Sequence, residues 1–137
     1  MKIKNLIIIL FFFFYSTKLF AEIIEVNNSK IKILMNRGVP LIDIRTEKEW
    51  YATGVINQSK LLTFFDKDGN YNAKKWIQEL GKIAKKNDPL IIICRSGRRS
   101  RIVSNLLDKQ ENYLKIFHAT NGILSWIVSK NKTVRPD

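Results

Sequence analysis

Short apolar runs recur along the chain and alternate with segments in which apolar residues return every three to four positions. The short runs predict buried β-strands, because the central strands of parallel sheets are apolar on both faces. The run at residues 90–93 is the most apolar of them and leads directly into Cys94. The predicted strands lie at residues 23–26, 41–44, 61–65, 90–93 and 113–117.

The segments with the longer period predict α-helices between these strands. In the third of them, Asn72 can cap a helix with one apolar face, formed by Trp76, Ile77, Leu80 and Ile83. Because strands and helices alternate, we predict the α/β fold class, a three-layer sandwich with a mainly parallel central sheet flanked by helices. The expected helices cover residues 30–36, 46–52, 73–86, 100–109 and 123–129.

The first residues of the chain follow a different pattern. Lys2 and Lys4 precede an unbroken apolar run at residues 6–15, and the small residue Ala21 ends the segment. A basic start, a short apolar centre and a small residue before the cleavage point are typical of a secretory signal peptide. The apolar run is also shorter than the roughly 20 apolar residues that a membrane-spanning helix needs.

We therefore expect residues 1–21 to be a signal peptide and residues 22–137 to form one mature domain, because no linker or repeat divides the rest of the chain. In a bacterium such a protein is exported to the periplasm. An uncleaved N-terminal membrane anchor is the alternative, because Leu19 is a less favourable residue near the cleavage point than a small one.

Composition and charge narrow the classes of function. Apolar residues make up 45% of the chain, which is the balance of a globular protein rather than a disordered one. The chain has 24 Lys and Arg residues against 12 Asp and Glu residues, and the resulting net charge of +12 attracts anions. A single cysteine and a single histidine argue against an internal disulfide and a metal centre, so no cofactor or metal is expected. Removal of the leader, with Lys2, Lys4 and Lys18, lowers the net charge to +9.

The strongest candidate site lies between the most apolar strand and a helix. Ligands of parallel sheets bind beyond the carboxyl ends of strands, and a helix N-terminus presents free N–H groups with a partial positive charge. Gly97 lets the backbone curl so that several N–H groups face one anion. We expect Cys94, at a partly exposed loop edge, to be a nucleophile whose thiolate these groups favour. The expected substrate-binding residues are Arg95, Ser96, Gly97, Arg98, Arg99 and Ser100.

This loop resembles the active-site loop of the rhodanese family, single-domain type, and the resemblance extends over about residues 31–127. Residues 41–56 resemble the family's first signature, and residues 117–126 resemble its closing segment. Val55 stands where the family often has histidine, and Asn121 replaces the first glycine of a Gly-Gly pair. Asparagine tolerates a positive φ better than most residues, so we expect this turn to persist.

The resemblance implies a rhodanese-like sandwich and a sulfurtransferase. Cys94 would take a sulfane sulfur from a donor such as thiosulfate, become a persulfide, and pass the sulfur to cyanide or a thiol. Arg98 or Arg99 would hold the sulfonate end of thiosulfate. The implied partners are therefore a small anionic sulfur donor and a thiol or cyanide acceptor, with a redox protein as a further candidate. The chain would act as a monomer or a homodimer.

Two other functions remain alternatives. A Cys-dependent phosphatase of the same fold would need an arginine six positions after Cys94, where this chain has Ser100. A non-catalytic rhodanese-like binding module usually lacks the cysteine that this chain retains. We expect no binding to nucleic acid, because the aromatic residues fall at core spacings, and no membrane contact beyond the leader.

Three further polar residues have a structural interpretation. We expect Asp43 and Arg45 to stabilise the fold, with Arg45 paired to Glu49 one helical turn away. His118 is a candidate catalytic base, but we interpret it as a polar residue at a strand end, because a thiolate already stabilised by its loop needs no base.

Overall fold

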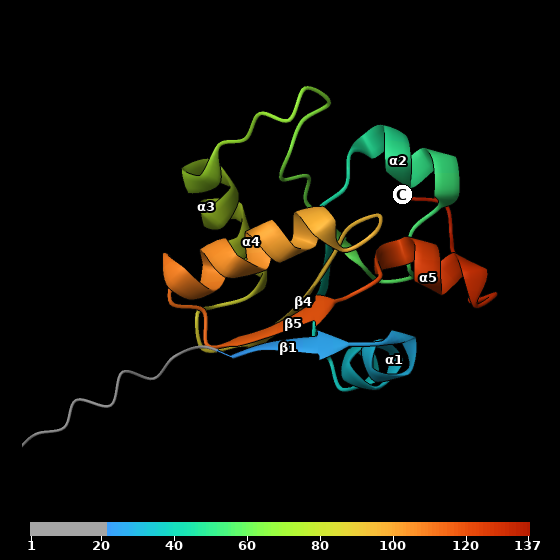
Figure 1. Ribbon diagram of the computed structural model, residues 1–137, viewed down its shortest axis with the longest axis horizontal. Helices are drawn as coiled ribbons and strands as arrows, with labels where there is room; N and C mark the ends of the chain where they lie inside the picture. The colour runs from blue at the N-terminus through green and yellow to red at the C-terminus, as the bar shows by residue number, and fades with distance from the viewer. Residues whose placement is uncertain (1–21) are drawn as a thin grey trace, which may run out of the picture.

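The strands of the domain form one sheet in which all neighbouring pairs run parallel (Figure 1). The computed structural model describes residues 22–137, and the predicted signal peptide lies outside the described residues. Because β4 is the central strand, the chain leaves the middle of the sheet's carboxyl edge at Cys94. In sheet order the strands are β1 (Glu22–Val26), β5 (Lys115–Ala119), β4 (Pro89–Ile93), β2 (Leu41–Asp43) and β3 (Lys60–Leu61).

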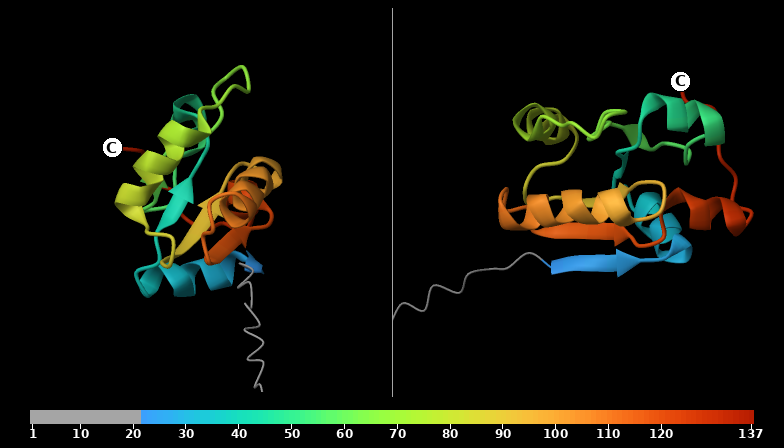
Figure 2. Two further views of the ribbon diagram at one scale, coloured as in Figure 1. Left: turned by 90° about the vertical axis from the view of Figure 1, so that its left-hand side faces the viewer. Right: turned by 45° about the horizontal axis from the view of Figure 1, so that its top comes forward.

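Helices cover both faces of this sheet, which gives the domain three layers (Figures 1 and 2). Helices α3 (Ala73–Ile83) and α4 (Arg98–Lys109) pack on one face. Helices α1 (Asn28–Asn36) and α5 (Gly122–Val128) pack on the other. The remaining helix, α2 (Glu47–Thr53), follows the carboxyl end of β2. The α/β sandwich predicted from the sequence is confirmed.

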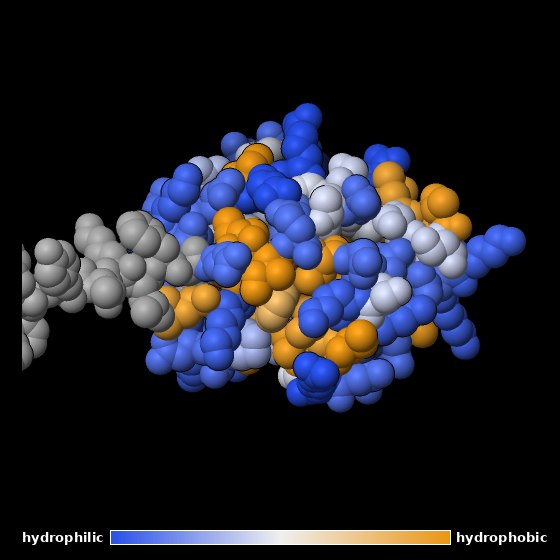
Figure 3. All heavy atoms as spheres, turned by 60° about the horizontal axis from the view of Figure 1, so that its bottom comes forward, coloured by the Kyte–Doolittle hydropathy of each residue, from blue (hydrophilic) through white to orange (hydrophobic). Residues whose placement is uncertain are grey.

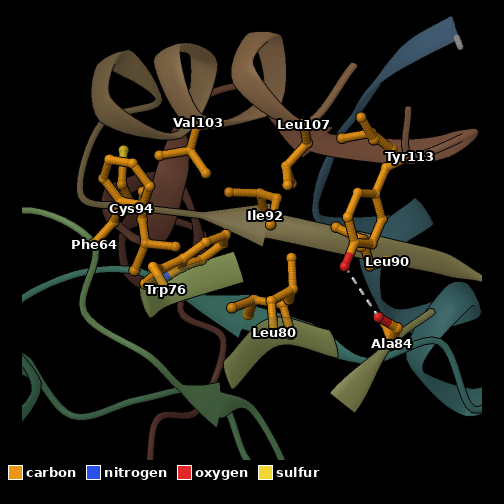
Figure 4. Close-up of a cluster of buried hydrophobic side chains, with 13 residues drawn as sticks. Phe64, Trp76, Leu80, Ala84, Leu90, Ile92, Cys94, Val103, Leu107 and Tyr113 are labelled. Atoms are coloured by element: carbon orange, nitrogen blue, oxygen red, sulfur yellow. Dashed lines mark hydrogen bonds between the residues drawn. The ribbon is translucent and has the colours of Figure 1, made fainter. Parts of the chain in front are cut away.

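Two hydrophobic cores join the layers, one on each face of the sheet. Successive residues of a strand point to opposite faces, so Ile92 faces α3 and α4 while Ile91 and Ile93 face α1 and α5. All three are 0% exposed, which makes β4 a fixed base for the loop that follows it. Figure 4 shows the core between the sheet and helices α3 and α4, which we call the first hydrophobic core. Its labelled side chains include Trp76, Leu80, Leu90, Val103 and Leu107.

The edge strand β3 is shorter than the sequence pattern predicts. The apolar run at residues 61–65 suggested one strand, but only Lys60–Leu61 pairs with β2 as a strand. After Leu61 the chain turns inward, and the ring of Phe64 packs edge-on against Trp76 with a centroid separation of 5.1 Å. The apolar run thus reflects burial of an aromatic loop rather than a longer strand.

Other predicted boundaries also move by two or three residues. Strand β5 begins at Lys115 rather than at Tyr113, because the N–H of Tyr113 donates to the carbonyl of Leu107 and closes the end of α4. Helix α3 ends at Ile83 rather than near residue 86, since Ala84 is extended and buried in the core. The hydroxyl of Tyr113 donates to the carbonyl of Ala84 at 3.3 Å, which ties these two helix ends together (Figure 4). Helix α4 begins at Arg98, two residues earlier than expected.

Hydrophilic side chains cover much of the surface, and apolar side chains gather between them on the face that Figure 3 presents. Large apolar side chains that reach solvent include Ile24 of β1 and Ile33 of α1. Among residues 22–137, no helix combines the length and the apolar character that crossing a membrane requires.

Candidate active site

The loop after β4 curls around the sulfur of Cys94. Gly97, at the N-cap position of α4, has a φ of +96°, and a Cβ there would overlap the backbone oxygen of Thr120. Only glycine fits this conformation and this close approach. The turn brings the N–H of Gly97 to 3.1 Å from Sγ of Cys94, so a backbone donor points at the sulfur.

The first residues of α5 support the same loop from the other side. The N–H of Ile123 donates to the carbonyl of Cys94 at 2.9 Å, and that of Leu124 donates to Arg95 at 3.1 Å. Gly122 has a φ of +60°, and a Cβ there would overlap the carbonyl of Arg95. The turn that we expected to persist with Asn121 is present, but its positive φ lies on Gly122, whereas Asn121 has a φ of −107°.

Cys94 is more deeply buried than the sequence suggested. We expected it at a partly exposed loop edge, but only 1% of the residue is exposed. The loop closes over it, and its neighbours on the sheet side belong to the first hydrophobic core. A reagent or substrate therefore reaches the sulfur through the loop that surrounds it.

A second polar contact of the sulfur leads into a network that the sequence did not reveal. Oγ of Ser100 lies 3.3 Å from Sγ of Cys94 and 2.8 Å from Nε2 of His118. Both Ser100 and His118 are buried, at 0% and 1% exposure. Nδ1 of His118 lies 2.9 Å from Oε2 of Glu25, its cross-strand neighbour in β1. The interpretation of His118 as a simple strand-end residue is therefore incomplete, because it links the cysteine to an acid.

The carboxylate of Glu25 is held in its ionised form. Burial alone would raise the pKa of Glu25, but hydrogen bonds from Thr120, His118 and Arg101 lower it to about 2. The hydroxyl of Thr120 donates to Oε2 at 2.6 Å, and Arg101 forms an ion pair with Oε1. Glu25 is 40% exposed, so the network ends at the surface.

Arg99 projects from the first turn of α4 and is held by Glu49 of α2. Its guanidinium makes two parallel bonds, with Nη2 to Oε1 at 2.6 Å and Nη1 to Oε2 at 2.9 Å. Burial alone would raise the pKa of Glu49, but hydrogen bonds from Arg99 and Thr46 lower it to about 2. Glu49 also closes a capping box with Thr46 at the start of α2, so the arginine is attached to a rigid helix end.

The predicted pairing of Arg45 with the Glu49 carboxylate is wrong. Arg45 instead forms a buried ion pair with Asp43 at 2.7 Å, and both residues are 1% exposed. Its guanidinium also donates to Oγ1 of Thr53 at 2.8 Å and to the carbonyl of Gly54 at 3.0 Å. A buried guanidinium needs a charged partner, and Asp43 at the end of β2 provides it for Arg45. The carboxylate of Glu49 binds Arg99 instead.

A cleft of about 800 Å³ opens between this loop and the start of α2. Arg98 is exposed at its rim, whereas Arg99 is only 26% exposed. Both signs of charge line the cleft, so it suits an anion that also carries hydrogen-bonding groups. Its lining consists of Thr46, Glu47, Lys48, Glu49, Thr63, Asp66, Lys67, Arg95, Ser96, Arg98 and Arg99.

The structure thus gathers the predicted loop residues at one site. Gly97 and Ser100 contact the sulfur of Cys94, and the other loop side chains line the cleft. Among residues 22–137, no three His, Cys, Asp or Glu side chains are grouped as a metal site would require.

The family of the chain follows from comparison with known sequences. Residues 27–129 match the Rhodanese-like domain. The chain belongs to the rhodanese family. Thiosulfate sulfurtransferase 18 of Arabidopsis thaliana is 23% identical over 111 residues, which cover 77% of this chain and 79% of the relative. Family membership and this distant relative support a sulfurtransferase-type enzyme at the family level.

Solved structures of this fold carry more than one described function. The polysulfide-sulfur transferase homodimer of Wolinella succinogenes has a TM-score of 0.63 and 17% identity, over 82% of this chain and 78% of the other. A protein of unknown function from Rhodopseudomonas palustris, described as a possible tyrosine phosphatase, has a TM-score of 0.59 and 17% identity, over 82% and 85%. At these identities the likeness concerns the fold alone, so the reaction must be argued from the site.

Proposed function

We propose that this rhodanese is a sulfurtransferase that carries sulfur on Cys94, with thiosulfate as a donor and cyanide or a thiol as acceptor. The observation that carries the proposal is the position of Sγ, which accepts a hydrogen bond from the N–H of Gly97 inside a loop bordered by a cleft whose lining includes Arg95, Arg98 and Arg99. A hydrogen-bond donor at the sulfur and a nearby helix N-terminus both stabilise negative charge, and a thiolate and a persulfide both carry negative charge.

The reaction proceeds in two displacements at sulfur. In the first, the Cys94 thiolate attacks the outer sulfur of thiosulfate, an S–S bond forms at Sγ, and sulfite leaves with the electron pair of the broken S–S bond. In the second, cyanide or a thiolate attacks the terminal sulfur of the persulfide. Thiocyanate or a new persulfide leaves, and the Cys94 thiolate is regenerated.

Ser100 favours this chemistry over the phosphatase alternative. A phosphate-binding loop on this fold would place an arginine at position 100, facing the bound phosphate. Here position 100 is a serine that is 0% exposed, and its Oγ lies 3.1 Å from the carbonyl of Gly97 as well as near Sγ. The same Oγ lies 2.8 Å from Nε2 of His118, so a buried polar contact within the protein stands where the phosphatase would have its arginine.

Mass spectrometry of the purified protein after thiosulfate treatment tests the proposal. We expect the mass of one sulfur atom to be added at Cys94, and cyanide to remove it with formation of thiocyanate. The same sample should hydrolyse an aryl phosphate poorly or not at all. An unchanged mass together with efficient cleavage of the phosphate ester would replace the sulfurtransferase by the phosphatase. Absence of both activities would favour the binding module.

Arg99 is expected to contribute more than Arg98 to capture of thiosulfate. Glu49 fixes the Arg99 guanidinium at the cleft, whereas Arg98 is exposed. A charge-assisted hydrogen bond contributes about 1.5–3 kcal/mol, so Arg99→Ala should raise KM for thiosulfate about tenfold or more. We expect a smaller effect for Arg98→Ala and an unchanged fold in both variants.

Steady-state kinetics with thiosulfate measure this difference. Arg37→Ala is the matched control, because it removes the same charge from an exposed position after α1, outside the cleft. If the dependence on thiosulfate is the same in all three variants, these arginines do not bind the donor.

The size of the cleft supports an acceptor larger than cyanide. Its volume of about 800 Å³ leaves room beside thiosulfate for a small-molecule thiol or for a cysteine side chain of a redox protein. The mixed charges of its lining give such an acceptor polar contacts. We include a small or protein-borne thiol as physiological acceptor in the proposal, with the chain acting as a monomer or a homodimer.

We also propose that the protein is exported and that its signal peptide is removed. Cleavage after Ala21 would leave Glu22, the first residue of β1, as the new N-terminus and would place the enzyme in the periplasm of a bacterium. N-terminal sequencing of protein recovered from an exporting cell should read from Glu22. An intact Met1 in the membrane fraction would point to the uncleaved anchor, and an intact Met1 in the soluble cytoplasmic fraction would exclude export.

A further inference from the structure

A continuous line of polar contacts connects the buried sulfur to the surface. It runs from Sγ of Cys94 to Oγ of Ser100 at 3.3 Å, to Nε2 of His118 at 2.8 Å, and from Nδ1 of His118 to Oε2 of Glu25 at 2.9 Å. Three elements supply these groups, since Ser100 lies in α4, His118 in β5 and Glu25 in β1. The register of the sheet places Glu25 directly beside His118.

The contacts of His118 fit two arrangements of protons. The Glu25 carboxylate is ionised, because its hydrogen bonds lower its pKa to about 2, so Nδ1 of His118 carries a proton and donates to it. If Nε2 is unprotonated, it accepts the proton of Ser100, and Oγ can accept the thiol proton of Cys94. If Nε2 is protonated, it donates to the carbonyl of Gly97 at 3.1 Å, and Ser100 can turn its proton to the sulfur.

We propose that these two arrangements are the resting and activated forms of Cys94, with His118 as the group that receives the thiol proton through Ser100. The thiol proton passes to Oγ of Ser100 as the hydroxyl proton passes to Nε2 of His118. The products are a thiolate that accepts a hydrogen bond from Ser100 and an imidazolium held by Glu25 and Gly97. No proton is gained or lost, and the thiolate is formed without contact with solvent.

His118 and Glu25 are then positioning residues for the proposed sulfur transfer, on which this inference rests. The charged and titratable groups around His118 are consistent with an imidazolium. Glu25 faces it from β1, the Cys94 sulfur lies beyond Ser100 at the end of β4, and Arg101 of α4 occupies the other oxygen of Glu25. We call the path of the proton from Cys94 through Ser100 to His118 the relay. Cys94 is 1% exposed and therefore has little direct access to water as a proton acceptor, whereas the relay provides an acceptor inside the protein.

The rate of alkylation of Cys94 by iodoacetamide, followed from pH 5 to pH 10, tests the relay. The reaction requires the thiolate but no sulfur donor, and the chain has no other cysteine. His118→Gln removes the nearby opposite charge, and Ser100→Ala removes the hydroxyl that contacts the sulfur, so in both variants we expect the alkylation rate to rise at a higher pH than in the unmodified protein. The rate at pH 7 should then fall about tenfold.

Ser104→Ala is the matched control for Ser100→Ala. Ser104 lies one turn further along α4, is also 0% exposed, and within residues 22–137 its Oγ has no hydrogen-bond partner. We expect its alkylation profile to equal that of the unmodified protein. Alkylation profiles that coincide for the unmodified protein, Ser100→Ala and folded His118→Gln would overturn the relay.

A second measurement needs no substitution at the site. The chain has one histidine, so NMR titration of its ring reports on His118 alone. The relay predicts that the imidazolium persists to higher pH while Cys94 is free than after alkylation, because alkylation removes the thiolate. Identical titrations in the two forms would overturn the proposal even if the variants fail to fold. Both tests are independent of thiosulfate, so the relay and the sulfurtransferase function can fail separately.

Discussion

Replacing Cys94 with serine will abolish sulfur loading and thiocyanate formation. The serine hydroxyl is far less acidic and less nucleophilic than a thiol at neutral pH, and it cannot form a persulfide. Within the sequence only Met1 and Met35 carry further sulfur, and a thioether does not accept a sulfane sulfur by this displacement. After thiosulfate treatment the variant should therefore keep its mass, as measured by mass spectrometry.

The same substitution should leave the fold nearly unchanged. Serine is slightly smaller than cysteine, and its hydroxyl can accept the N–H of Gly97 and meet Oγ of Ser100 in place of the sulfur. We expect the free energy of unfolding to fall by no more than about 1 kcal/mol. A folded Cys94→Ser variant that still gains a sulfur atom from thiosulfate would show that the carrier is not Cys94.

The sequence predicts the scaffold well because its signals are local. A run such as residues 90–93 is apolar on both faces, and only a strand in the middle of a parallel sheet needs that composition. The spacing of Trp76 and Leu80 likewise requires one buried helix face. Errors occurred where an apolar residue is buried outside a regular element, as with Phe64 and Tyr113.

The site was only partly predictable, because its polar contacts join distant segments. The loop from Cys94 to Ser100 is contiguous, and its composition indicates an anion site. Glu49 and Arg99 lie 50 positions apart, so no helical spacing could pair them, and the local rule favoured Arg45 instead. The network of His118 and Glu25 depends on strand order, which places β1 beside β5 at the opposite end of the chain.

One signal could have pointed to His118. His118 stands two residues after Ile116 in β5, so the two side chains point to the same face of the sheet. Ile116 is 0% exposed on that face. A histidine in such a position must be buried and must find hydrogen-bond partners. The sequence could therefore have shown that His118 is buried, but not that its partner across the sheet is Glu25.

Replacing Gly97 with alanine will disrupt both the loop and the stability of the domain. At a φ of +96° an L-residue is strained, and a Cβ would overlap the backbone of Thr120, which no side-chain rotation can relieve. Strain of this kind costs about 1–3 kcal/mol by itself, and the overlap adds to it. Because relief of the overlap moves the N–H of Gly97 away from Sγ, sulfur loading from thiosulfate should be lost together with stability.

The variant Gly69→Ala separates the backbone strain from the overlap with Thr120. Gly69 has a similar φ of +83°, in the turn between β3 and α3, but nothing lies within 4 Å of a Cβ placed there. This variant should therefore lose only the strain energy, about 1 kcal/mol, and retain full sulfur loading. Denaturant unfolding gives both free energies, and mass spectrometry after thiosulfate treatment gives both loadings. Equal losses in the two variants would show that backbone strain alone, rather than the contact with Thr120, makes glycine necessary in the loop around Cys94.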